Sequence, residues 1–278
     1  MQLVPVSARQ LAAFADRHAG RIPFDTSPRH LAGPGDARHV THGLAAAGWT
    51  CTSDLLSPEI ALYSPDHRYN LTFDPQSPTS AWWRLQARPT ANEPSWYAQF
   101  GELLPAEVLG HVTDALIAPT PAQAHNPFRI LETAGWVRDS TNTAYSTDGM
   151  CYVQRRPTKE DATVSSWRIE ACKPGHGTPM GPRIWHAWFA DGAPEHLVST
   201  FITALADPAP LQRGMYEGLG HYSAVQQPSP LTPEQVVAAH AKRLDTIRVQ
   251  ARAARRQQEA ALTTTPARTG VSRSAARR

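Results

Sequence analysis

The sequence repeats itself at a spacing of 89 residues, and this duplication constrains the fold more than any other feature. Nine equivalent positions need no gap: Trp96/Trp185, Phe100/Phe189, Pro105/Pro194, Val108/Leu197, Leu109/Val198, Val112/Phe201, Ala115/Ala204, Leu116/Leu205 and Pro119/Pro208. Upstream, two shorter stretches repeat with small shifts: Ala47-Gly48-Trp49 with Ala134-Gly135-Trp136, and Trp83-Arg84-Leu85 with Trp167-Arg168-Ile169. A chain of 278 residues accommodates two such units of about 100 residues, each with its own core.

Each repeat changes from helical to strand-like periodicity after its Ala-Gly-Trp. Apolar residues alternate on both sides of a turn at 64–67, and the second repeat does the same around 146–149. A helix with one apolar stripe then closes each repeat, beginning at Pro105 or Pro194. The sequence therefore predicts an α+β fold of two tandem repeats related by approximate two-fold pseudosymmetry. Each repeat is expected to be an antiparallel sheet of about five strands with flanking helices.

Six segments follow from composition and capping signals. They are an N-terminal helix followed by an entry segment to the first repeat (1–30), the first repeat (31–120), the second repeat (121–210), a linker rich in glycine and proline (211–230), a basic helix (231–262) and a disordered basic tail (263–278). Ser7 and Thr232 are the expected helix caps. Residues 231–278 contain ten Lys and Arg and three acidic residues, whereas the preceding residues contain 17 basic and 21 acidic residues. The positive charge is thus concentrated at the C-terminus.

Composition also predicts the location of the protein. No apolar run reaches the roughly 18 residues that a membrane span requires, and polar side chains interrupt the first 20 residues. We therefore expect a cytoplasmic protein with no membrane contact. Cys51, Cys151 and Cys172 are odd in number and do not occupy equivalent positions, which predicts small buried thiols without disulfides.

Several motifs of the first repeat are similar to those of a known family. They are S-P-R-H-L-A-G-P-G-D at 27–36, A-G-W at 47–49, S-P-D at 64–66, W-W-R-L-Q-A at 82–87, and W-Y-A-Q-F followed by P-A-E at 96–107. The chain resembles the streptomycete domain of unknown function 317 family, over most of 27–120 and in weaker form over 127–208. The resemblance implies two tandem copies and does not indicate any particular activity. The family places a small hydroxyl residue before the helix proline, where this chain has Leu104 and Ala193, so we expect uncapped helices.

Motifs of catalysis are absent from the sequence. There is no nucleophile elbow, P-loop, metalloprotease helix or dinucleotide fingerprint. The glycine-rich stretch 175–181 lacks a following helix and is interpreted as a hairpin loop. His39 and His42 have a spacing that fits one metal ion, but no third ligand can be named. We predict no catalytic residue, metal or cofactor, and an enzyme is the weakest hypothesis because it needs a convergence of acids or histidines that no motif indicates.

Arg84 and Arg168 are the duplicated polar residues with the clearest functional potential. Both lie beside a core tryptophan and point to the opposite face of a strand, where they suit an acidic partner or a phosphate backbone. The alternative is an intramolecular pair, with Asp66 and Asp148 as the candidate partners. Six tryptophans at duplicated positions are expected in the core, namely Trp49, Trp83, Trp96, Trp136, Trp167 and Trp185, whereas Trp82 is expected to be exposed.

The basic C-terminal segment is the strongest functional signal of the sequence. Arg248, Arg252, Arg255 and Arg256 form a stripe on the predicted helix, and further arginines continue into the tail. Such arms attract nucleic acid through the release of counterions. Together with Arg84 and Arg168 these residues predict a macromolecule-binding protein that contacts nucleic acid. The alternatives are a protein-interaction or oligomerisation module without nucleic acid, and a tail with no specific partner.

Overall fold

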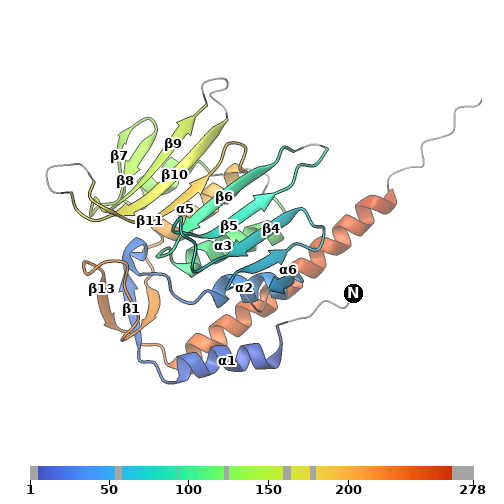
Figure 1. Cartoon of the computed structure of the whole chain (residues 1–278), viewed down its shortest axis with the longest axis horizontal. Helices are drawn as coiled ribbons and strands as arrows, with labels where there is room; N and C mark the ends of the chain where they lie inside the picture. The colour runs from blue at the N-terminus through green and yellow to red at the C-terminus, as the bar shows by residue number, and fades with distance from the viewer. Residues whose placement is uncertain are drawn as a thin grey trace, which may run out of the picture.

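One antiparallel sheet of ten strands dominates the computed structural model, which describes residues 6–53, 58–91, 93–121, 125–158, 164–175 and 180–264. The strand order is β2-β3-β4-β5-β6-β11-β10-β9-β8-β7. Helices pack on one face of this sheet, and in Figure 1 they lie behind the strands. The α+β class with two tandem repeats is confirmed, and the two expected five-stranded sheets are joined edge to edge.

Each repeat contributes a helix, five consecutive strands and a second helix. The first repeat contains α2 (Arg38–Ala46), β2 (Thr50–Ser53), β3 (Ile60–Tyr63), β4 (Tyr69–Phe73), β5 (Ala81–Ala87), β6 (Trp96–Gly101) and α3 (Ala106–Ile117). The second contains α4 (Pro127–Thr133), β7 (Val137–Ser140), β8 (Thr143–Tyr145), β9 (Cys151–Pro157), β10 (Ser165–Cys172), β11 (Arg183–Phe189) and α5 (Glu195–Ala206). Consecutive strands are neighbours in both repeats, so the strand order is the same, as a duplication requires.

The repeats join where β6 pairs with β11, and the register of this pair shows where the pseudo-two-fold axis lies. Gln99 lies opposite Trp188, which is its own equivalent 89 residues later. Exchange of the repeats also interconverts the flanking pairs Ala98/Phe189 and Phe100/Ala187. The axis therefore passes between Gln99 and Trp188, and the ten-stranded sheet has two equivalent halves.

Helices α2, α3, α5 and α4 form one layer that packs on the sheet and encloses the core. The equivalent stripes of α3 and α5 are buried there, with Val108, Leu109, Val112, Leu197, Val198 and Phe201 fully covered. The six tryptophans predicted for the core are all buried: Trp49, Trp83, Trp96, Trp136, Trp167 and Trp185. Neither α3 nor α5 has a side-chain N-cap, as Leu104 and Ala193 indicated.

Cysteine burial follows the position of each strand. All three cysteines are free thiols. Cys151 and Cys172 are buried as predicted, but the prediction is wrong for Cys51, which is exposed because β2 is an edge strand. Among the described helices none combines the length and the apolar character that crossing a bilayer demands.

A second sheet consists of three strands in segments for which the sequence predicts no strand. Its central strand β1 (Pro23–Ser27) pairs with β12 (Leu211–Gly214) on one side and β13 (Val225–Pro228) on the other. Residues 211–230, expected to be a linker, thus supply two strands, and the segment after the N-terminal helix within 1–30 supplies the third. These strands are four or five residues long, and their partners are distant in the sequence. Such short pieces carry no local periodicity from which pairing can be predicted.

Buried polar side chains attach the motif at 27–36 to both repeats. Arg213 on β12 is buried, donates to the carbonyl of Ala32 at 2.9 Å and pairs with Glu107 of α3 at 2.7 Å. The ring of His30 lies 2.9 Å from a carboxylate oxygen of Asp148 in the second repeat. The motif therefore has a structural role, because it binds the two halves of the molecule to each other.

The terminal helices pack on the outer side of the helix layer. Helix α1 (Ala8–Ala19) begins after Ser7, whose hydroxyl caps it as predicted. Helix α6 (Pro233–Thr264) contacts α1, α2 and α3 and runs past the sheet half of the first repeat in Figure 1. Its Leu244, Ile247 and Ala251 are buried, so the apolar stripe of this helix is covered within the chain. The predicted disordered tail lies outside the described residues from 265 onwards.

Candidate functional site

Arg84 and Arg168 belong to one row of residues that crosses the sheet. From β3 to β8 the paired residues are Ala61, Thr72, Arg84, Gln99, Trp188, Arg168, Gln154 and Thr143. Every residue on one side of the axis is the repeat equivalent of a residue on the other. Three strand spacings, about 14 Å, separate the two arginines. The fold thus places both on one continuous surface, which we call the open face: the side of the ten-stranded sheet that α2–α5 leave uncovered.

Hydroxyl groups hold Arg84 in place. Its guanidinium donates to Ser77 Oγ at 2.9 Å and to Thr79 Oγ1 at 3.2 Å, and both acceptors lie between β4 and β5. Within the described ranges no carboxylate forms an ion pair with Arg84. Its positive charge is therefore not neutralised by those residues.

Arg168 instead pairs with Glu170, two residues further along the same strand. Its Nε and one terminal nitrogen donate to Glu170 Oε1 at 2.9 and 2.8 Å, and the hydroxyl of Tyr152 donates to Oε2 at 2.6 Å. Burial alone would raise the pKa of Glu170, but the hydrogen bonds from Tyr152 and Arg168 outweigh it and lower this pKa. The carboxylate is ionised at neutral pH and fixes the position of the Arg168 guanidinium.

The expected pairing of these arginines with Asp66 and Asp148 is wrong. Each aspartate stabilises its own turn: Asp66 accepts from the hydroxyl of Ser64 at 2.5 Å, and Asp148 accepts from that of Ser146 at the same distance. Burial of Asp148 opposes its ionisation, but the hydrogen bond from His30 prevails and lowers its pKa. The two aspartates are thus duplicated because the hairpin turns require them.

Exposed aromatic rings lie beside the arginines on the open face, and the sequence analysis did not single them out. Tyr97 is 44% exposed and Trp188 is 40% exposed, and their ring centres are 6.1 Å apart. Strand parity was the available signal, because both residues alternate with core positions of β6 and β11. Trp82, expected to be exposed, is only half-buried, since it packs against Phe73.

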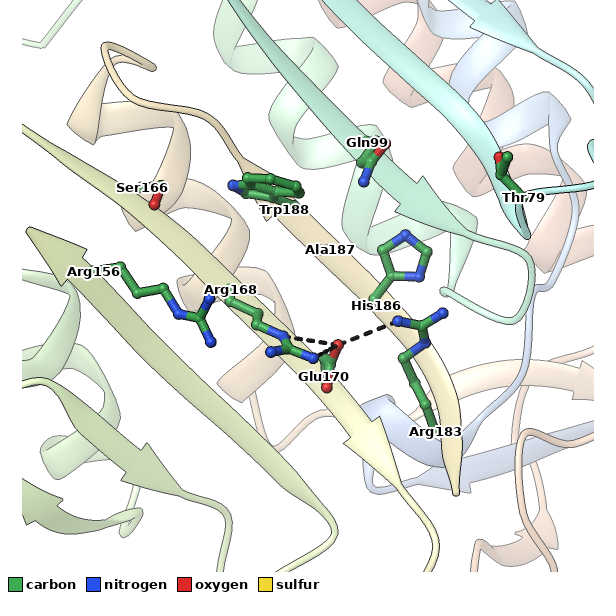
Figure 2. Close-up of a pocket in the computed structure, with 10 residues that line it drawn as sticks. All are labelled: Thr79, Gln99, Arg156, Ser166, Arg168, Glu170, Arg183, His186, Ala187 and Trp188. Atoms are coloured by element: carbon green, nitrogen blue, oxygen red, sulfur yellow. Dashed lines mark hydrogen bonds and ion pairs between the residues drawn. The ribbon is translucent and has the colours of Figure 1, made fainter. Parts of the chain in front are cut away.

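Two cavities open on this face, and Trp188 lines both. The first, of about 300 Å³, is charged and includes Arg156, Arg168, Glu170, Arg183 and His186 (Figure 2). The second, of about 600 Å³, is lined by Asn70, Gln86, Arg88, Tyr97 and Asp191 among others. The row Asn70-Gln86-Tyr97 is the repeat equivalent of Tyr152-Glu170-His186. Glu170 and His186 border the charged cavity, whereas their equivalents Gln86 and Tyr97 border the second, which is a neutral cavity because its Arg88 and Asp191 carry opposite charges.

The arginines of the basic helix lie apart from this surface. Arg248 pairs with Asp245, and Arg255 donates to the carbonyl of Ala47 at 2.6 Å. Arg252 and Arg256 are exposed. Because α6 packs on the opposite side of the helix layer, the structure does not bring these residues together with Arg84 and Arg168.

His39 and His42 lie in a cluster of rings rather than at a metal site. His42 Nδ1 is 3.2 Å from His240 Nε2 of α6, and His240 stacks on Phe14 of α1 at 4.0 Å between ring centres. No group of three or more ligating side chains suited to a metal ion occurs among the residues that the structure describes. Most of the loop expected at 175–181 lies outside those residues.

Comparison with protein families gives one match in each half of the sheet. Segments 63–122 and 145–211 match the SPDY family, a domain of unknown function (DUF317). The chain carries two SPDY domains. In each, the match includes the central strands, the arginine of the open face and the closing helix, whereas α6 and all of the three-stranded sheet except Leu211 lie outside the SPDY segments. No curated protein and no solved structure matches the chain.

Proposed function

We propose that this protein binds single-stranded nucleic acid on the open face of its sheet. It acts as a cytoplasmic macromolecule-binding protein rather than as an enzyme, and the basic C-terminal arm strengthens the contact. The observation that carries the proposal is the row Arg84-Gln99-Trp188-Arg168, in which two arginines, one from each SPDY domain, flank a glutamine and an exposed ring.

Charge on the open face favours a polyanion. Four arginines point to this face from β5, β9, β10 and β11, namely Arg84, Arg156, Arg168 and Arg183. Among the outward positions of the described strands β4, β5, β6, β9, β10 and β11, Glu170 is the single acid. Guanidinium groups bind phosphate oxygens with two parallel hydrogen bonds, which suits a sugar-phosphate backbone.

The exposed rings favour unpaired bases over a duplex. Tyr97 and Trp188 each present an exposed aromatic surface near the pseudo-two-fold axis, on which a base can stack. Bases inside a duplex are already stacked and do not offer their faces to side chains. Rings between arginines therefore match a strand whose bases are free.

The C-terminal helix supplies an auxiliary charge in this proposal. Arg252 and Arg256 are exposed on α6, and arginines continue beyond the described residues. They lie away from the open face, so they add sequence-independent attraction and no base contact.

Binding of another protein is the competing function, and one feature supports it. The connection between β12 and β13 exposes Met215, Tyr216 and Tyr222, the last two almost completely. Aromatic and methionine side chains of this kind are enriched at protein interfaces. A protein partner at this connection would leave Arg84 and Arg168 without a role in binding.

Fluorescence anisotropy with a labelled single-stranded oligonucleotide, measured at several salt concentrations, separates the two functions. We expect the double variant Arg84→Gln/Arg168→Gln to bind at least about tenfold more weakly, with a salt slope smaller by about 1.4, because two phosphate contacts are lost. Arg129→Gln on α4 removes one exposed charge from the helix side and serves as the control. Thermal unfolding confirms that each variant is folded.

The role of the arm needs substitution rather than truncation before α6. A chain that ends at Pro230 would lose the buried Leu244 and Ile247, so its failure to bind would reflect unfolding. Arg252→Gln/Arg256→Gln leaves the packing of α6 intact.

Unchanged affinity of the open-face variant, or no binding by the wild type, contradicts the proposal.

A further inference from the structure

The charged cavity of the second SPDY domain is more specialised than a general backbone contact requires. Arg156 from β9, Arg168 from β10 and Arg183 from β11 converge on it, with Trp188 along one side in Figure 2. A sugar-phosphate backbone that binds along a sheet without a fixed position needs dispersed cations. Three guanidinium groups around one cavity instead suit one compact anion.

Glu170 anchors two of the three arginines of this cavity. Its Oε1 accepts from Arg168 and lies 3.4 Å from Arg183, and Tyr152 binds the other oxygen. The carboxylate is 5% exposed, so it is fixed at the floor of the cavity while both guanidinium groups reach solvent. Three arginines and one carboxylate leave a net charge of +2.

That charge selects among phosphate groups. A phosphodiester inside a strand carries a single negative charge, whereas a phosphate monoester carries about −1.5 to −2 at neutral pH. The ring of Trp188 and the amide of Gln99 border the same cavity, where a base attached to the phosphate can stack and form a hydrogen bond. The cavity thus combines groups for a doubly charged phosphate with groups for an adjoining base.

The first SPDY domain provides the internal comparison. Gln86 stands where the second domain has Glu170, Tyr97 where it has His186, and Asp74 where it has Arg156. These three positions of the first domain therefore contribute no arginine, and the neutral amide of Gln86 replaces the carboxylate of Glu170. This difference between otherwise equivalent halves indicates that the second one has a distinct ligand.

We infer that the charged cavity binds a phosphate monoester next to a nucleobase: the phosphorylated end of a strand or a free nucleoside monophosphate. The inference rests on the proposed function, since it makes this cavity the place where the bound strand ends. Arg156, Arg168 and Arg183 hold the phosphate, Trp188 stacks on the base, and Glu170 positions Arg168.

The full chain is titrated with four oligonucleotide probes and two small competitors. The oligonucleotides share one sequence and carry a 5′-phosphate, a 5′-hydroxyl, a 3′-phosphate or a 3′-hydroxyl, and the competitors are a nucleoside monophosphate and its nucleoside. We expect one phosphorylated end to bind about tenfold or more tightly than its hydroxyl counterpart, because charge-assisted hydrogen bonds are gained. Arg156→Gln should abolish this preference, and Arg88→Gln in the neutral cavity should preserve it.

The outcomes separate this inference from the proposed function. Equal binding of phosphorylated and hydroxyl strands overturns the inference and leaves the nucleic-acid function intact. Binding of the monophosphate alone, lost in Arg156→Gln, supports the cavity with a free nucleotide as its ligand and overturns the nucleic-acid function. Binding of none of the six probes overturns both.

Discussion

At the scale of single residues, duplication preserved three different kinds of side chain. The tryptophans recur because they fill the space between sheet and helices: Trp83 and Trp167 are equivalent, and each is about 95% covered or more. Asp66 and Asp148 recur because their hairpin turns need an acceptor. Arg84 and Arg168 remain as the duplicated pair on the open face, and their packing does not explain why both are arginine.

Removal of a buried tryptophan tests the first kind. We expect Trp83→Ala or Trp167→Ala to lower the free energy of unfolding by about 3 to 5 kcal/mol, because a large cavity is left in the core. Trp188→Ala is the matched control on the open face and should cost about 1 kcal/mol or less, since its ring is 40% exposed. Denaturant unfolding measures all three. Equal losses for Trp83→Ala and Trp188→Ala would contradict the assignment of the two faces.

The buried cation Arg213 gives a second test at this scale. Arg213→Met should destabilise the protein by about 3 to 5 kcal/mol, because Glu107 and three carbonyl groups lose their donor. Arg248→Met on α6 removes a partly exposed arginine with a local partner and should change the stability by less than about 1 kcal/mol. A neutral Arg213→Met would show that the three-stranded sheet does not depend on this ion pair.

At the scale of elements, the spacing of apolar residues and the residue types in the turns made most of the repeat predictable. The hairpins around 64–67 and 146–149, the strands β5 and β10, and helices α1, α3 and α5 all follow from local patterns. The sheet of β1, β12 and β13 did not, because its strands are short and their register depends on partners far away in the sequence. The sequence also does not predict that His240 attaches α6 to α1 and α2, because a histidine on the apolar stripe of a helix does not indicate which side chain it contacts.

The histidine cluster between α1, α2 and α6 predicts a pH-dependent stability. Burial lowers the pKa of His240 to about 3, with further effects from His39 and His42, and burial lowers that of His42 to about 4. The unfolded chain protonates these rings near pH 6.5, whereas the folded chain resists protonation until its lower pKa values. Stability is therefore complete above about pH 6.5 and declines as the pH falls towards 4.

Thermal unfolding between pH 7 and 4 measures this effect. We expect a loss on the order of 1 to 3 kcal/mol across the interval. His240→Phe keeps a ring against Phe14 and removes one titrating group, so its stability should fall less steeply. Parallel pH profiles for the variant and the wild type would contradict a role for His240.

At the scale of the whole molecule, the two SPDY domains act as one surface. The sequence predicted two related units and placed Arg84 and Arg168 on equivalent strands, but it did not show that β6 and β11 join edge to edge. That junction depends on long-range backbone pairing, and only it brings both arginines, Tyr97 and Trp188 onto one face. The fold therefore makes a composite surface from positions that seem separate in each repeat.

The most direct test of the central claim is the location of a bound strand. Photo-cross-linking of a halogenated single-stranded oligonucleotide to the full chain, followed by mass spectrometry of the cross-linked peptides, identifies the contacting side chains. We predict cross-links to Tyr97 and Trp188, which lie between the two arginines on the open face. Cross-links confined to residues 231–278, or to the connection between β12 and β13, would contradict the account.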